Sequence, residues 1–132
     1  MAYYERSLTV PANTTEDSPI RLVWPLSRGV ITRMTVFFPP GCAGLAKLRI
    51  YRGHMQLWPN DLGEWIKGDG REVLVESYYE LTSYPYELTV EAINEDDTYS
   101  HTPILRCIIV PVEVANLAMV LGRILGLFTR HR

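Results

Sequence analysis

Residues 29–53 read GVITRMTVFFPPGCAGLAKLRIYRG, and this stretch decides the expected fold. Two runs of strand-forming residues, 30–38 and 45–52, flank a connection rich in proline and glycine. In each run apolar residues take alternate positions and so share one side: Met34, Val36 and Phe38, then Ala46, Leu48 and Ile50. Such a period of two is typical of a strand with one buried face, whereas the Pro-Gly connection cannot continue a ladder. The pattern predicts a long antiparallel pair of strands at the centre of a β-sandwich.

Further strand-like runs recur on both sides of this stretch. They cover residues 3–10, 20–24, 55–58, 71–76, 86–93 and 102–112. About eight strands at regular spacing, with no helical period among them, are the pattern of a sandwich or jelly roll. The chain of 132 residues is long enough for one such domain. We expect an all-β, jelly-roll-like antiparallel sandwich over residues 1–112 and a helical tail over 113–132.

The tail has a different period from the rest of the chain. Residues 114–128 read VANLAMVLGRILGLF, in which Asn116 and Arg123 are the polar interruptions. Apolar residues recur at helical spacing and make one stripe, while Glu113 at the start suits the helix dipole. This pattern predicts one amphipathic helix.

A helix that is apolar on most sides needs a partner surface, and three are open. The helix folds back on its own sheet, packs with the same helix of other subunits, or docks on a membrane or another protein. Gly122 and Gly126 have the spacing that permits close helix contact. A membrane contact is the less favoured partner, because a spanning helix needs ~20 apolar residues and this run is shorter. The expected partner-binding residues are Leu117, Leu121, Gly122, Ile124, Leu125, Gly126 and Phe128.

Aromatic residues flank two long expected connections, residues 59–70 and 77–85. Exposed aromatic rings on a sandwich can stack on sugars or serve as protein contacts, whereas packing in the core or at its rim is the plainer interpretation. The residues considered for such a ligand site are Trp58, Trp65, Tyr79 and Tyr84.

Signals for catalysis, cofactors and metals are weak in this sequence. The three histidines have no second ligand at short spacing, and no nucleophile elbow or phosphate-binding glycine pattern occurs. The acidic turn at 94–97 offers oxygen atoms for calcium, but it lacks the EF-hand spacing, so a solvated turn is favoured. Cys42 and Cys107 are expected to be two buried or half-buried thiols, with a disulfide as the alternative. We expect a non-enzymatic protein without cofactor or metal.

The net charge of −2 gives no reason to expect a nucleic-acid partner, and the N-terminus shows no signal peptide. In its alternating strands, its PPGCAG and NEDDTY loops and its small size, the chain resembles β-sandwich virion proteins of bacteriophages, such as capsid decoration or minor capsid proteins. This resemblance implies a structural subunit of the virion that self-associates into a homo-oligomer and grips another structural protein. The alternative function is a carbohydrate-binding module.

Overall fold

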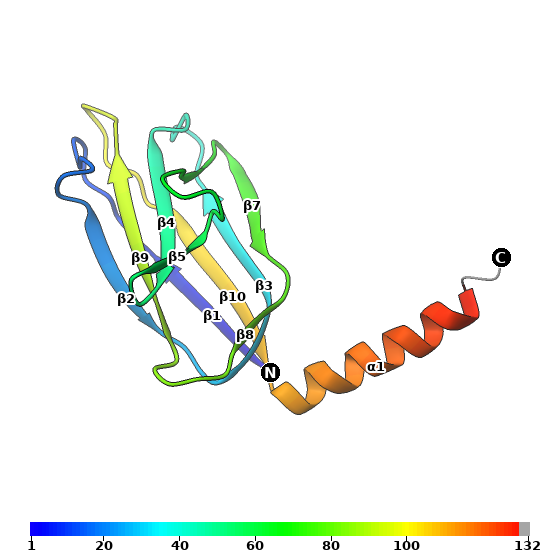
Figure 1. Cartoon of the computed structure of the whole chain (residues 1–132). Coiled ribbons are helices and arrows are strands. Elements are labelled where there is room, and N and C mark those ends of the chain that lie inside the picture. Colours follow the sequence, from blue (N-terminus) through cyan, green and yellow to red (C-terminus); the bar gives the residue numbers. More distant parts are fainter. Residues whose placement is uncertain (130–132) are drawn as a thin grey trace.

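The computed structural model describes residues 1–129, without the side chains at 119 and 125–129. Two antiparallel sheets of five strands pack face to face, and one helix follows them (Figure 1). The strands are β1 (Ala2–Ser7), β2 (Ile20–Pro25), β3 (Gly29–Phe38), β4 (Ala46–Arg52), β5 (Met55–Trp58), β6 (Ile66–Lys67), β7 (Arg71–Glu76), β8 (Tyr79–Leu81), β9 (Glu87–Asn94) and β10 (Ile104–Val110), and the helix is α1 (Val112–Thr129).

The order of the strands is that of a jelly roll. One sheet, the β3 sheet, has the order β1-β10-β3-β7, with β8 also paired to β3. The other, the β4 sheet, has the order β2-β9-β4-β5, with β6 also paired to β4. Because β5 and β6 pair with successive parts of β4, and β7 and β8 with successive parts of β3, each couple is one interrupted strand. Eight strands are then divided equally between two open sheets, which confirms the expected fold class.

The predicted alternation along the two central runs is confirmed, but their predicted pairing is wrong. The side chains expected to share a buried face are fully buried in β3 and in β4. However, β3 and β4 belong to different sheets and face each other across the core. Seven residues, 39–45, connect them. A connection of this length exceeds the two to five residues typical of a hairpin and is long enough to cross the ~10 Å between packed sheets.

Two short strands lie inside segments that the sequence predicts to be connections. β6 has two residues and β8 has three. A period of two needs about four residues to be recognised, so neither strand leaves a readable pattern. Both are held by pairing with a long neighbour, β4 or β3, rather than by their own composition.

The core between the sheets is apolar and includes both cysteines. Trp24 and Phe38 are among its largest fully buried side chains. Cys42 and Cys107 are both free and buried, as the favoured interpretation of the sequence expects. Burial in apolar surroundings raises the pKa of the Cys107 thiol to about 12. Neither cysteine therefore links distant parts of the chain.

Helix α1 leaves the sandwich at the end where β10 finishes. Only Pro111 separates the strand from the helix, and the first helical hydrogen bond runs from Ala115 N to Pro111 O. From this root the helix projects away from the body (Figure 1). Ala2 pairs with Ile109, so the N-terminus lies at the same end.

Candidate functional site

The projecting helix carries the largest group of exposed apolar side chains in the described part of the chain. Ala115 is its one buried residue there, and it is 5% exposed. Five larger side chains are between 44% and 60% exposed: Val114, Leu117, Val120, Leu121 and Ile124. Apolar side chains of this size are normally covered in a folded protein, so α1 is the first candidate for a contact surface.

Four of these residues form a line along the helix. Val114, Leu117, Leu121 and Ile124 follow one another at intervals of three, four and three residues. We call these four the α1 seam, because this spacing is that of the buried line in a coiled coil. Asn116 and Arg123 lie on the opposite side of the helix, since they are offset by about half a turn.

The other residues expected to bind a partner are placed differently. Gly122 follows Ala115 by seven residues and so lies on the same side as Ala115, away from the α1 seam. A Cβ atom added at Gly122 would meet nothing within 4 Å. Leu125, Gly126 and Phe128 belong to α1, but their side-chain surroundings lie outside what the structure describes.

Two of the three possible partners of the helix can be compared with the structure. The described side chains of the seam do not fold back on the sandwich, because all four are more than 40% exposed. Over the described residues, α1 lacks the combination of length and apolar character needed to cross a bilayer. The α1 seam is thus free to contact a partner outside its own sandwich.

Two of the four aromatic residues considered for a ligand site meet at the open edge of the sandwich. Trp58 and Trp65 both line a pocket of about 430 Å³ between β5, β6 and β7. Trp58 is only 4% exposed. Its Nε1 donates a hydrogen bond to Glu76 Oε1 at 3.0 Å, which ties the two sheets together. Trp58 is therefore mainly a structural side chain.

Trp65 is covered on one ring face by an arginine. The guanidinium carbon of Arg49 lies 3.6 Å from the centre of the Trp65 ring. Arg49 also donates to the backbone oxygens of Gly63 and Glu64, at 2.7 and 3.1 Å. These contacts hold the loop between β5 and β6 against the β4 sheet. A sugar would have to use the remaining face of Trp65.

The two tyrosines do not complete one aromatic platform. Tyr79 packs edge-to-face against Trp58 with ring centres 5.4 Å apart. Tyr84 is 84% exposed and packs edge-to-face against Tyr86 instead. Of the four residues, only Trp58 and Trp65 line the pocket, while Tyr79 contacts Trp58 without lining it and Tyr84 pairs with Tyr86 instead.

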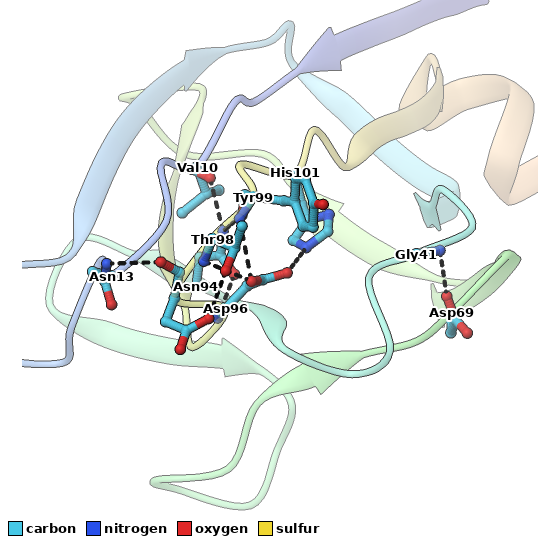
Figure 2. Close-up of polar contacts among 10 residues, drawn as sticks. Val10, Asn13, Gly41, Asp69, Asn94, Asp96, Thr98, Tyr99 and His101 are labelled. Carbon is cyan, nitrogen blue, oxygen red and sulfur yellow. Dashed lines mark hydrogen bonds and ion pairs between the residues drawn. The ribbon is translucent and has the colours of Figure 1, made fainter.

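The end of the sandwich opposite α1 is closed by hydrogen-bonded loops. Figure 2 shows Asn94 at the centre of one such cluster. Its fully buried side chain donates to Val10 O at 3.1 Å and to Tyr99 O at 3.0 Å, and its Oδ1 accepts from Asp96 N at 3.0 Å. The turn is exposed at Glu95 and Asp97, as expected from the sequence, but it is anchored by the buried side chain of Asn94. The segment also connects two sheets rather than closing a hairpin.

Asp96 holds the same loop in place through three hydrogen bonds. Its Oδ1 accepts from the backbone amides of Thr98 and Tyr99, at 2.9 and 3.2 Å, and its Oδ2 accepts from His101 Nε2 at 2.9 Å. The Thr98 amide, followed by His101 and the Tyr99 amide, lowers the pKa of the Asp96 carboxyl. Its oxygens therefore serve the protein itself. Among the described residues there is no group of three or more side chains arranged to hold a metal.

The lowered pKa of Asp96 gives a prediction for acid stability. A carboxyl whose pKa is lower in the folded state stabilises the fold above its unfolded pKa of ~4, and this contribution is lost as the pH falls through the folded value. We expect the free energy of unfolding, measured by urea titration, to fall more steeply with acid below about pH 4 in the wild type than in Asp96→Asn. Equal slopes for the two proteins would show that Asp96 does not contribute.

The outer faces of the two sheets carry paired charges rather than apolar patches. On the β4 sheet, Glu91 lies between Arg21 and Arg49, at 3.0 and 3.6 Å. On the β3 sheet, Arg106 lies between Glu5 and Glu72, at 3.0 and 3.3 Å. Their charges are balanced within the molecule. The most apolar exposed element of the described chain is α1.

Sequence reasoning did not assign a role to several of these residues. The buried amide of Asn94 is one, although Asn at the start of a turn is a signal for a side chain that bonds the backbone two residues on. Arg49 is another, because its partners come from a loop that begins seven residues after the end of β4.

Comparisons of the chain with protein-family models, with curated proteins and with solved structures find no match.

Proposed function

We propose that this protein is a non-enzymatic structural subunit that assembles with copies of itself through α1. The observation that carries the proposal is the exposure of the α1 seam on a helix that projects from a well-packed body. Burying these side chains would contribute several kcal/mol at ~25 cal/mol per Å² of apolar area, less the cost of association.

The packed core and the charged faces of the sandwich support a structural role. Its core is fully packed, and its broad faces carry ion pairs of both signs. A rigid domain with one apolar projection suits a building block better than a catalyst, whose reacting groups must converge in a cleft. Jelly rolls are also the architecture of many virus capsid subunits. The setting we propose is accordingly a virus particle, in which the subunit contacts itself and another structural protein.

The test compares two full-length variants with equal added charge. Leu117→Glu with Leu121→Glu places two carboxylates on the seam, and Asn116→Glu with Gly122→Glu places two on other sides of the helix. We expect light scattering to give an oligomer for the wild type and for the second variant. We expect the seam variant to be a monomer of 15.1 kDa with an unchanged circular dichroism spectrum of the sandwich. A monomeric wild type at ~100 μM, or an assembled seam variant, would contradict the proposal.

The virion setting has a separate test. If the protein is a structural component, particles purified from a lysate should contain it in a fixed ratio to the major coat protein through successive density gradients. A protein that stays in the soluble fraction of the same lysate would contradict this setting, and it would leave self-assembly through α1 untouched.

A further inference from the structure

We infer that α1 assembles as a parallel bundle of three or more copies rather than as a two-stranded coiled coil. This inference rests on the proposed self-assembly and adds the number of helices in the bundle and their relative direction. In heptad positions a to g, the seam places Val114 and Leu121 at a and Leu117 and Ile124 at d. The positions that flank a seam are e and g, and they decide how many helices can pack.

The flanking positions inside the seam are apolar, whereas Glu113, at g just before Val114, is charged. Ala118 occupies e, and Val120, which is half exposed, occupies g. In a two-stranded coiled coil these positions face water and are commonly Glu or Lys. In a bundle of three or more, each helix contacts two neighbours, so the buried arc widens and covers e and g as well. The apolar arc of α1 thus matches the wider interface.

The residue types within the second heptad of the seam also favour three or more helices. Leu at a with Ile at d favours trimers or tetramers, whereas a β-branched residue at a with Leu at d favours dimers. Leu121 and Ile124 have the first arrangement. Val114 and Leu117, in the first heptad, have the arrangement of a dimer. The apolar flank formed by Ala118 and Val120, between the two heptads, favours the larger bundle.

The parallel direction follows from the body. The end from which α1 leaves carries other exposed apolar side chains: Met55, in the strand after the β4–β5 turn, is 61% exposed, and Tyr84, in the β8–β9 connection, is 84% exposed. A parallel bundle places this end of each body beside the same end of its neighbours, whereas an antiparallel bundle separates them.

A membrane surface is the less suitable partner, because the described helix has a single basic residue, Arg123.

The first experiment exchanges two residues of the seam without changing its composition. Leu121→Ile with Ile124→Leu gives both heptads a β-branched residue at a and Leu at d. We expect sedimentation equilibrium to give three or more chains for the wild type and a lower average mass for the exchanged variant, whose unchanged apolar flank opposes full conversion to a dimer. The mass should be unaffected in Gly122→Ala, at position b.

A second variant tests the flank. Val120→Glu should weaken assembly at least tenfold if position g is buried, whereas Asn116→Glu, at position c, should not weaken it. A wild-type dimer that tolerates Val120→Glu would overturn the inference and leave self-assembly standing. A wild type that stays a monomer, and that instead sediments with vesicles of phosphatidylcholine and phosphatidylglycerol, would overturn both.

The direction is tested by a cysteine at position a. The native thiols are buried, so Val114→Cys supplies the reactive group. Equivalent a positions meet in a parallel bundle, and mild oxidation should give a covalent dimer on a non-reducing gel. Reduction should reverse it. An assembled variant that gives no covalent dimer would exclude the parallel arrangement.

Discussion

Replacement of Asn94 by aspartate is expected to lower the free energy of unfolding by about 3–5 kcal/mol at pH 7. The change keeps the shape of the side chain but replaces its donating amide by a carboxylate. The carbonyl oxygens of Val10 and Tyr99, at 3.1 and 3.0 Å, would then face a buried negative charge without a donor between them. Urea unfolding followed by tryptophan fluorescence measures the loss.

The pH dependence of this variant separates charge from geometry. The buried setting raises the pKa of the new carboxyl, so acid protonates it in the folded state and restores one donor. The stability gap to the wild type should therefore narrow as the pH falls from 7 towards 5. Asn13→Asp is the matched control, because Asn13 is exposed and its contact to Asp97 O is 3.3 Å long. An Asn94→Asp protein as stable as this control would contradict the prediction.

Replacement of Gly29 by alanine is expected to cost about 3 kcal/mol and about 10 °C in Tm. A Cβ atom at this position would lie 2.5 Å from Val110 O and 2.6 Å from Ile109 Cγ2. Real Cβ atoms do not approach other atoms so closely, and a backbone oxygen in a ladder cannot turn aside. β3 and the end of β10 would have to separate next to the root of α1.

Differential scanning calorimetry measures this effect, and Gly122→Ala is the control. The same methyl group at Gly122 meets no atom within 4 Å and replaces glycine in a helix, where alanine is favoured by about 1 kcal/mol. We expect the Tm of the sandwich to be unchanged in the control. A Gly29→Ala protein with the wild-type Tm would show that the junction can open at no cost.

The sequence predicts where the strands of this fold lie better than it predicts which strands pair. Alternation identifies the inward side of β3, β4 and β9 because each strand buries one face. It cannot say whether β3 and β4 pair or face each other, because either arrangement buries the same side chains. The length of the 39–45 connection was the signal that favoured a crossing between sheets.

The sequence predicts that the candidate site is a helix, but it does not predict that this helix projects from the sandwich. The apolar period of residues 114–128 gives the helix, and the structure begins it two residues earlier, at Val112. Whether such a helix packs on its own sheet depends on the direction in which the chain leaves β10. No local sequence pattern determines that direction. The cluster around Asn94 depends on the carbonyl group of Val10, from a distant segment, as well as on that of Tyr99 in the same loop, and so it left no sequence signal beyond its Asx turn.

The direct passage from β10 into α1 decides how a mechanical load would enter the molecule. β10 is an interior strand, bonded along its length to β1 on one side and to β3 on the other. A pull on the helix along the direction of β10 would be resisted by both ladders in shear, with many hydrogen bonds sharing the force at once. Tension applied through α1 would therefore be carried by the most firmly held strand of its sheet.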